Sequence, residues 1–221
     1  MKRSVLIVDD HPIMRRGVVS LIGVEKDLEI TSEAGTAAEA ITILESIDLP
    51  DLAIVDLSLP DKSGLELTKD IVALYPDLKV LVMSMHEESR YCERVLRAGA
   101  RGYIMKEAAA ENLVRAIRRV LDGQIYVSDS MSSNLLEILA GRRPTSESSP
   151  IERLTDREIE VYEWIGRGKG SREIASQLNI SIRTVDAHRA HLKEKLGVKD
   201  SNSLVRSAVK WVESEQPDRV R

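Results

Sequence analysis

Polar side chains suited to metal and phosphoryl chemistry end or directly follow short apolar runs in the first half of the chain. They are Asp9, Asp10, Asp56, Ser84 and Lys106. Three clustered carboxylates repel one another, and Mg²⁺, which prefers oxygen ligands, relieves that repulsion. One carboxylate can then attack phosphorus and form an aspartyl phosphate. An ammonium and a hydroxyl beside it can bind the phosphoryl oxygens. The residue types therefore predict a magnesium-dependent phosphoryl-acceptor site.

This chemistry requires the five runs to lie side by side, and their pattern predicts a parallel sheet. The expected strands are Val5–Val8, Leu28–Ala34, Leu52–Val55, Lys79–Ser84 and Arg101–Met105. Amphipathic segments alternate with them: Pro12–Ile22, Ala37–Ile47, Leu65–Leu74, Arg90–Arg97 and Asn112–Leu121. Short, mostly apolar strands that alternate with helices indicate an α/β doubly wound domain. Such a sheet binds ligands at the carboxyl ends of its strands, where all five polar residues are expected.

Four motifs carry a resemblance to a known family. They are LIVDDHP (Leu6–Pro12), IVDLSLPDKSG (Ile54–Gly64), VMS (Val82–Ser84) and GYIMK (Gly102–Lys106). With these motifs, roughly residues 3–123 resemble the receiver domain of two-component response regulators, whose fold is a five-stranded parallel flavodoxin-like sheet.

The receiver resemblance implies a role for each matching residue. Asp56 would be the phosphoacceptor. Asp10 and Asp56 would bind Mg²⁺, with Asp9 nearby and the Ser58 carbonyl as a third protein ligand. Ser84 and Lys106 would contact the phosphoryl group. Tyr103 would be the switch aromatic, whose ring turns inward when Ser84 moves to the phosphate. Lys62 departs from the family, because many relatives have an apolar residue there.

Three further residues that could do chemistry receive simpler interpretations. His11 precedes Pro12 and is interpreted as part of a helix start. His86 and Cys92 follow the fourth strand without a partner pattern. The single cysteine excludes an internal disulfide framework and a multi-cysteine metal site.

The second half of the chain has a different, all-helical pattern. Asp129–Ala140 is a possible sixth helix, and the Pro/Ser-rich stretch Gly141–Pro150 predicts a linker with a boundary near 142–152. Beyond it, Thr155 and Glu158 form a capping-box pattern that opens a helix. Three more helices are expected: one from Ser171 to Asn179, one from the cap Ser181 to Leu196, and Ser201–Val212. Two short helices joined by a tight turn indicate a helix-turn-helix unit, whose second helix enters the DNA major groove.

Helical spacing divides the residues of the second helix of this unit. Val185, Leu192 and Leu196 share one stripe and are expected in the core, with His188 packed beside them. Arginine on the opposite face can read guanine, and the small alanines let the backbone approach base edges. Lys169, Arg172, Lys193 and Lys195 are interpreted as phosphate contacts. The complete set of candidate DNA contacts is Lys169, Ser171, Arg172, Ser181, Arg183, Thr184, Ala187, Arg189, Ala190 and Lys193. The alternative is that these charges form only a solvated helix face.

A second resemblance covers Leu154 to about Trp211. The segments LTDREIEV, GKGSREIA, LNIS and RTVDAHRAHLKEKLGV are similar to the LuxR-type DNA-binding domain. With the receiver, the chain resembles the NarL/FixJ family of transcriptional regulators. Ser171-Arg172 replaces the usual Asn-Lys, and Asp186 stands where relatives are often basic. An acid there would repel phosphate or accept a hydrogen bond from a cytosine amino group.

The two resemblances together imply an organisation and a set of partners. They imply a receiver domain at 1–124, a helix and linker at 125–152, and a LuxR-type helix-turn-helix domain at 153–215. The implied partners are double-stranded DNA and a cognate histidine kinase, with a homodimer formed on phosphorylation. Phosphorylation of Asp56 would then control DNA binding and transcription.

The charge distribution agrees with this division. The net charge of −4 is the sum of −6 over residues 1–130 and +2 over residues 131–221. Within the second segment, residues 165–210 hold ten basic and four acidic side chains. An acidic half beside a basic segment suggests that the basic segment meets a polyanion. Seven aromatic residues and no Phe give little support for a single-strand stacking platform. The apolar runs are too short for a membrane span and no signal-peptide pattern begins the chain, so a cytoplasmic protein is expected.

Two other functions fit parts of the pattern. An aspartate-nucleophile phosphatase would also use Mg²⁺, but such enzymes need an acid two residues after the nucleophile, where this chain has Ser58. Alternatively, the first domain could serve only for dimerisation of a phosphorylation-independent DNA binder. The complete acidic site argues against that alternative.

Overall fold

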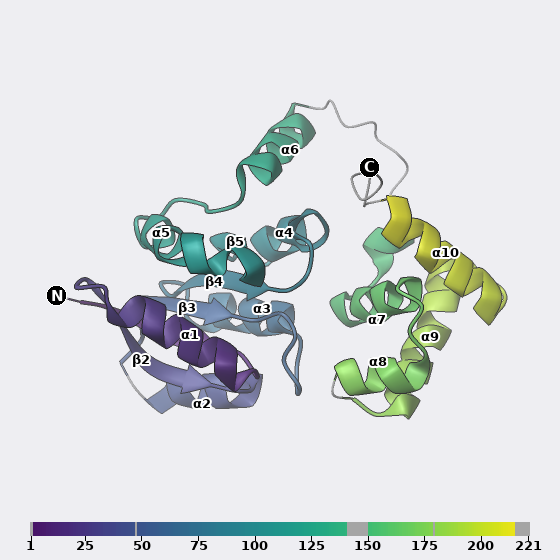
Figure 1. Cartoon of the computed structure of the whole chain (residues 1–221), viewed down its shortest axis with the longest axis horizontal. Helices are drawn as coiled ribbons and strands as arrows, with labels where there is room; N and C mark the ends of the chain where they lie inside the picture. The colour runs from purple at the N-terminus through teal and green to yellow at the C-terminus, as the bar shows by residue number, and fades with distance from the viewer. Residues whose placement is uncertain (1, 47, 141–149, 179, 215–221) are drawn as a thin grey trace. The chain divides into compact units, whose positions relative to one another are not determined.

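The computed structural model describes residues 2–46, 48–140, 150–178 and 180–214. The chain divides into two compact units, Met1–Arg143 and Pro144–Arg221, which run from purple to teal and from green to yellow in Figure 1. None of the helices among the described residues combines the length and apolar character needed to cross a bilayer.

The first unit is built on a five-stranded parallel sheet in the order β2-β1-β3-β4-β5. The strands are β1 (Arg3–Val8), β2 (Leu28–Ala34), β3 (Leu52–Val55), β4 (Lys79–Ser84) and β5 (Gly102–Met105). This confirms the predicted doubly wound fold. The buried apolar runs explain it, since both faces of the inner strands are covered by helices.

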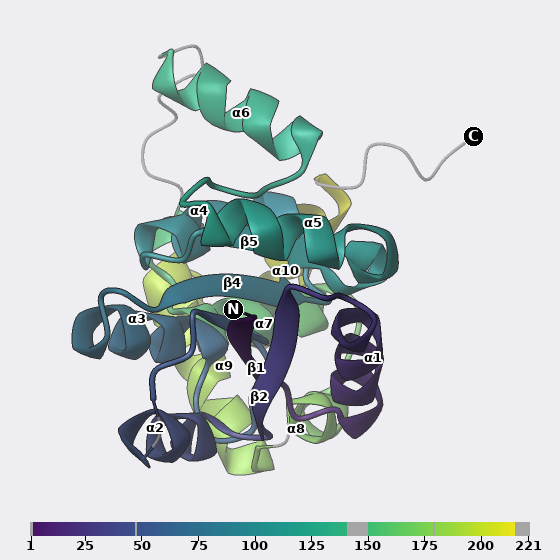
Figure 2. The same cartoon turned by 90° about the vertical axis from the view of Figure 1, so that its left-hand side faces the viewer.

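Helices cover both faces of this sheet, as Figure 2 shows for α1 and α3 on opposite sides of the strands. They are α1 (Pro12–Gly23), α2 (Ala37–Ser46), α3 (Gly64–Leu74), α4 (Glu88–Arg97) and α5 (Ala109–Leu121). One core lies between the sheet, α1 and α5, where Val18 and Ile22 of α1 and Ile117 of α5 pack with strand residues such as Ile54. This packing holds the sheet rigid beneath the carboxyl ends of its strands.

Several element boundaries differ from the predicted ones. Strand β1 begins at Arg3 and β5 at Gly102, and α4 begins at Glu88, two residues earlier than predicted. A 3₁₀ turn, η1 (Lys106–Ala108), follows β5. Helix α5 begins directly after this turn, three residues before its predicted start at Asn112. His11 is the residue before α1, as predicted, but its side chain makes no capping hydrogen bond.

The chain after α5 adds to the edge of the sheet before it enters α6 (Asp129–Leu139). Tyr126 pairs with Gly102 in an isolated parallel bridge. The N–H of Tyr103 donates to the Tyr126 carbonyl at 2.9 Å, and the N–H of Tyr126 donates to the Arg101 carbonyl at 3.0 Å. The segment thereby covers the outer edge of β5, which would otherwise expose unpaired backbone groups.

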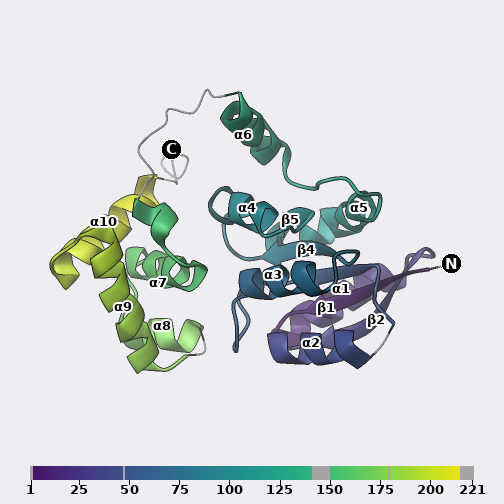
Figure 3. The same ribbon diagram turned by 180° about the vertical axis from the view of Figure 1, so that it is seen from behind.

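The second unit is all helical, as predicted, and Figure 3 shows its helices from behind. It contains η2 (Pro150–Arg153), α7 (Asp156–Gly166), α8 (Ser171–Gln177), α9 (Ile182–Leu196) and α10 (Ser201–Ser214). Both halves of the predicted capping box before α7 are present. Gly197 ends α9 in the left-handed conformation at φ +66°. Most of the predicted linker, 141–149, and Asn179 lie outside the described residues.

Candidate functional site

Two buried aspartates meet where neighbouring strands end. Val8 and Val55 are paired across β1 and β3, so Asp9 and Asp56, which follow them, lie side by side. Asp9 is fully buried and Asp56 is 2% exposed. The close approach of α3 to this point requires glycine, because a Cβ atom on Gly64 would lie 1.8 Å from the Asp56 carbonyl oxygen. The fold thus fixes the Asp56 backbone from both sides.

Lys106 brings a positive charge to both carboxylates. It directly follows β5, and its Nζ lies 2.7 Å from Asp9 Oδ2 and 2.7 Å from Asp56 Oδ2. Its side chain is only 3% exposed. Two buried anions and one cation leave a net negative charge inside the site, so the site attracts a further cation.

Burial controls the ionisation of these groups. It raises the pKa of Asp56 from 3.8 to about 6, against the attraction of Lys106 and with the repulsion of Asp9. Burial alone would lower the pKa of Lys106, but the charges of Asp56 and Asp9 outweigh it and raise that pKa. Lys106 is therefore a permanent cation beside a carboxylate that ionises near neutral pH.

Asp10 and His11 complete the acidic group on its more open side. One side-chain ligand atom from each of Asp9, Asp10, His11 and Asp56 lies within 4.8 Å of the others. The Nδ1 atom of His11 is 2.6 Å from Asp10 Oδ1 and 3.3 Å from Asp9 Oδ1, and its backbone N–H donates to Asp9. Three carboxylates at this spacing suit a hard, oxygen-seeking divalent cation. From the sequence, His11 was interpreted only as part of a helix start, and its contact with the carboxylates was not predicted.

Ser84 and Tyr103 lie in the same region and are both fully buried. The hydroxyl of Ser84 accepts a hydrogen bond from the N–H of His86 at 3.1 Å, and the Tyr103 hydroxyl donates to the His86 carbonyl at 2.7 Å. Burial raises the pKa of Tyr103 above its usual value, so the phenol stays protonated. The switch-position ring thus already points inward in this structure.

His86 links this hydroxyl pair to the loop after Asp56. Its Nε2 lies 3.1 Å from the Ser58 hydroxyl, and its ring packs on Tyr91 at a centroid distance of 4.7 Å. No sequence pattern pairs His86 with Ser58, so this contact was not predicted. Lys62, the family departure in this loop, forms an exposed ion pair with Asp70.

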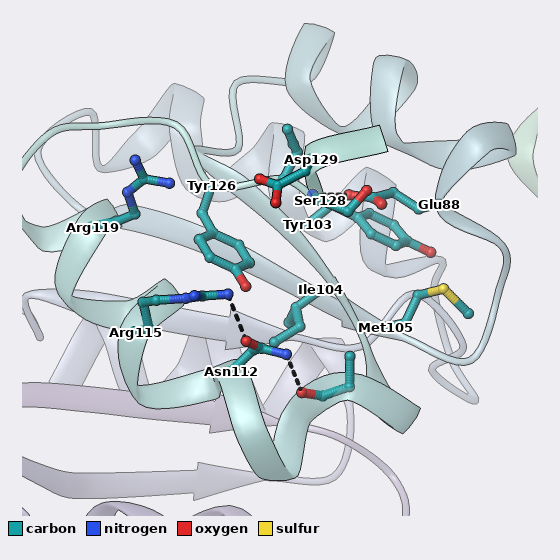
Figure 4. Close-up of a pocket in the computed structure, with 12 residues that line it drawn as sticks. Glu88, Tyr103, Ile104, Met105, Asn112, Arg115, Arg119, Tyr126, Ser128 and Asp129 are labelled. Carbon is teal, nitrogen blue, oxygen red and sulfur yellow. Dashed lines mark hydrogen bonds between the residues drawn. The ribbon is translucent and has the colours of Figure 1, made fainter. Parts of the chain in front are cut away.

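A hollow of about 520 Å³ borders Tyr103 on the α5 side (Figure 4). Arg115 of α5 donates to Asn112 at 2.6 Å and lies 6.0 Å from the centre of the Tyr126 ring. On the opposite side, Glu88 accepts a hydrogen bond from the N–H of Ser128 at 2.9 Å. The start of α4 is thereby joined to the segment that leads into α6.

The candidate DNA contacts lie on α8, α9 and the loops beside them. Val185 and Leu192 are buried, while Arg183, Ala187 and Ala190 are exposed on α9, as predicted. Leu196, expected in the core with them, is only half-buried at the end of the helix. Arg189 and Lys193 are half-buried at its flank. The other exposed or half-exposed candidates are Lys169, Ser171, Arg172, Ser181 and Thr184.

Some candidates also have partners within the unit. Ser181 caps α9 by accepting from the N–H of Thr184, and the two hydroxyls lie 2.8 Å apart. Lys169 forms an ion pair with Glu173 at 2.9 Å. Lys195, interpreted from sequence as a phosphate contact, donates to Glu158 at 2.7 Å. That contact ties α9 to α7.

His188 is half-buried, as expected for a packed histidine. Burial, together with the charge of Arg157, lowers the pKa of His188. The imidazole is therefore neutral at physiological pH and adds no charge to α9.

Comparison with known proteins gives matches over both units. The sequence profile of the response regulator receiver domain matches residues 5–118, and that of the bacterial regulatory proteins of the luxR family matches 152–208. The oxygen regulatory protein NreC of Staphylococcus carnosus is 36% identical over 211 residues, covering 94% of this chain and 97% of that protein.

Two solved structures of RcsB also resemble the chain over most of its length. RcsB from Salmonella enterica serovar Typhimurium, bound to promoter rprA with the phosphomimetic BeF₃⁻, has a TM-score of 0.62 at 28% identity. It covers 95% of this chain and 99% of that one. A structure of two RcsB dimers bound to two parallel DNAs has a TM-score of 0.57 at 28% identity, covering 95% and 100%.

Proposed function

This chain belongs to the two-component response regulators that combine a receiver domain with a LuxR-type DNA-binding domain, and we propose that Asp56 is its phosphoacceptor. Membership of this family of transcription regulators excludes the phosphatase alternative. The observation that carries the proposal is the buried contact of Asp56 and Asp9 with Lys106, beside Asp10. The kinase partner follows from the receiver domain, and we expect phosphohistidine to be its donor group.

In the proposed reaction, a carboxylate oxygen of Asp56 attacks the phosphorus of a phosphohistidine. The P–N bond breaks, and its electron pair leaves with the imidazole. Mg²⁺, held by Asp10 and Asp56 with Asp9 nearby and the Ser58 carbonyl, would supply charge neutralisation for the phosphoryl oxygens. The Lys106 ammonium then exchanges its contact with Asp56 for a contact with one phosphoryl oxygen. The Ser84 hydroxyl donates a hydrogen bond to a second phosphoryl oxygen.

We further propose that the modification acts through Tyr103 and the segment that follows α5. When Ser84 turns to the phosphoryl group, its hydroxyl is drawn away from the His86 backbone, which also holds Tyr103. The Glu88–Ser128 hydrogen bond joins the start of α4 to the segment that leads into α6 (Figure 4). Domain limits of 1–124 and 153–215, with a connecting helix and linker at 125–152, suit this role.

For the output, we propose that α9 enters the major groove of operator DNA. Arg183, Ala187 and Ala190 then face the bases, with Arg189 and Lys193 beside them. Lys169, Arg172, Ser181 and Thr184 are proposed to contact the backbone and fix the helix in the groove, with Ser171 at the start of α8 beside them. Because the proposed operator DNA is chromosomal, we also propose a cytoplasmic location.

We propose a phosphorylation-dependent homodimer as the binding species. One helix-turn-helix module buries only about 600–1,000 Å² on DNA, which is small for specific binding. Two modules on half-sites roughly 10 bp apart would double that area. The RcsB structure with dimers on DNA supports this assembly by similarity.

Treatment with a small-molecule phosphodonor and Mg²⁺ tests the proposal. We expect mass spectrometry to find one phosphoryl group on Asp56 and operator affinity to rise at the same time. Asp56→Asn should lose both effects and keep the fold. An equal operator affinity with and without the donor would contradict phosphorylation control and favour the constitutive DNA binder instead.

A further inference from the structure

An acidic side chain lies on the exposed side of α9, within a basic surface. Asp186 follows the buried Val185 and precedes the exposed Ala187. Its Oδ1 accepts a hydrogen bond from the Ser171 hydroxyl at 2.9 Å, which joins α9 to the first residue of α8. The carboxylate is therefore held in one orientation by the neighbouring helix.

The rest of this carboxylate has no partner within the described part of the chain. Neither Arg183 nor Arg189, one turn away on either side, reaches it with an ion pair, and Ser171 is its one hydrogen-bond donor there. Oδ2 of Asp186 is open to whatever docks on α9. On a surface that meets DNA, this charge must either repel the ligand or find a donor.

The hydrogen-bond donors that DNA can offer to this carboxylate are amino groups of the bases. Phosphate and deoxyribose oxygens accept hydrogen bonds but donate none, so a carboxylate turned toward the backbone loses water and gains nothing. The major groove has two donors, the N4 amino group of cytosine and the N6 amino group of adenine. Adenine also presents its N7 acceptor beside N6, which repels an anion, whereas the cytosine edge has no acceptor of its own.

The position of Asp186 places it at base edges. It is in the second turn of α9, and the N-terminal turns of the second helix in such a unit contact the bases. Its neighbour Ala187 leaves room for close approach of the helix. We propose that Asp186 determines specificity by accepting a hydrogen bond from the N4 amino group of a cytosine in each half-site, while Ser171 holds its other oxygen. This inference rests on the proposed binding of α9 in the major groove.

Selection from a random DNA pool with the phosphodonor-treated full chain tests this inference. For the wild type, we expect a required cytosine at one position of each half-site. Asp186→Ala should relax that position alone, with roughly tenfold lower discrimination. Asp186→Asn should change the preference at that position to adenine, because an amide pairs with N6 and N7 together. Ser171→Ala should keep the cytosine but weaken its selection.

Glu194→Gln is the matched control, since it removes one negative charge from an exposed residue further along α9. We expect it to raise affinity slightly for every sequence without changing any base preference. If Asp186→Ala behaves in the same way, Asp186 only repels DNA and the inference is wrong. A wild-type protein that selects no sequence would instead contradict DNA binding by α9, and with it this inference.

Discussion

At the scale of single residues, the acidic site is a balance between burial and charge. Asp9 and Asp56 have lost their water, and Lys106 is the one cation that touches both among the described residues. A carboxylate that is to attack phosphorus must be ionised, yet burial opposes its ionisation. An added cation would therefore stabilise the ionised carboxylates of the site, which favours metal binding before phosphoryl transfer.

This balance predicts a stability effect of Asp56→Asn. Burial raises the pKa of Asp56 from 3.8 to about 6, so the folded state holds the proton more tightly than the unfolded chain. That contribution is complete below about pH 4 and is lost as the pH rises through 6. In the presence of a chelator, Asp56→Asn should exceed the wild type in free energy of unfolding by about 2–3 kcal/mol at pH 7.5.

Urea unfolding of both proteins from pH 4 to 8, without divalent cations, measures this difference. It should shrink as the pH falls and be well under about 1 kcal/mol at pH 4, where Asp56 is protonated in the folded state and partly protonated in the unfolded chain. A difference that stays constant over the whole range would show that Asp56 is ionised even when buried.

Lys106→Met should have the opposite effect at neutral pH. Two buried carboxylates then have no cation, which costs about 3–5 kcal/mol of the free energy of unfolding. Lys62→Met is the control, because it breaks the exposed ion pair with Asp70 and should cost less than about 1 kcal/mol. Mg²⁺ should recover part of the stability lost in Lys106→Met and none in Lys62→Met. Similar losses in both variants would contradict the burial argument.

At the scale of elements, the approach of α3 to the end of β3 sets the position of Asp56, the proposed phosphoacceptor. Gly64 begins α3 with its N–H donating to the Leu57 carbonyl at 2.8 Å, directly against the Asp56 backbone. Ser63 caps the helix through the N–H of Leu65. The loop that carries Ser58 is thus closed by a contact that leaves no room for a side chain.

Gly64→Ala is expected to disturb both stability and chemistry. Its Cβ would overlap the Asp56 carbonyl oxygen, so the helix or the strand end must move, at a cost of about 1–3 kcal/mol. Gly17→Ala is the matched control, since nothing lies within 4 Å of its Cβ and it should gain about 0.5–1 kcal/mol as a helix residue. Thermal unfolding and the rate of phosphoryl incorporation measure the two effects. Normal incorporation in Gly64→Ala would show that the loop tolerates the displacement.

The sequence predicted the elements better than the contacts between them. Buried parallel strands carry continuous apolar runs, so all five were found, and their order placed Asp56 and Lys106 at one edge. The start of α4 was missed because Glu88 bonds to Ser128, forty residues away. The pairing of Tyr126 with Gly102 involves a single residue pair, so no alternating sequence pattern could indicate it.

Histidine contacts were equally hidden from the sequence. The imidazole of His11 reaches its sequence neighbour Asp10 through the local conformation of the turn before α1, whereas that of His86 reaches Ser58 because the fold brings two separate loops together. In the second unit, helical spacing was sufficient for His188, whose position is set by its own helix. Lys195 lies on the same helix, but its contact with Glu158 depends on the packing of another helix, α7. Local periodicity thus predicts a face, and tertiary packing decides the partner.

At the scale of the whole molecule, the charge asymmetry has a structural basis. All the carboxylates of the acidic site belong to the unit Met1–Arg143, and all the candidate DNA contacts belong to Pro144–Arg221. In the proposed function, each ligand is therefore bound by residues of one unit alone. A ligand that binds only the folded form of a unit stabilises that unit by mass action.

Calorimetry of the full chain should consequently resolve two transitions with different ligand responses. Mg²⁺ at about 100 times its dissociation constant contributes roughly 2.7 kcal/mol to the folded state that binds it, which raises one transition by several degrees. Asp10→Asn should lose most of this shift, because it removes a carboxylate from the cluster without disturbing the buried Lys106 contacts. An operator duplex should raise the other transition. If Mg²⁺ raised both transitions equally in the unphosphorylated protein, the expectation that the cation binds only the first unit would be wrong.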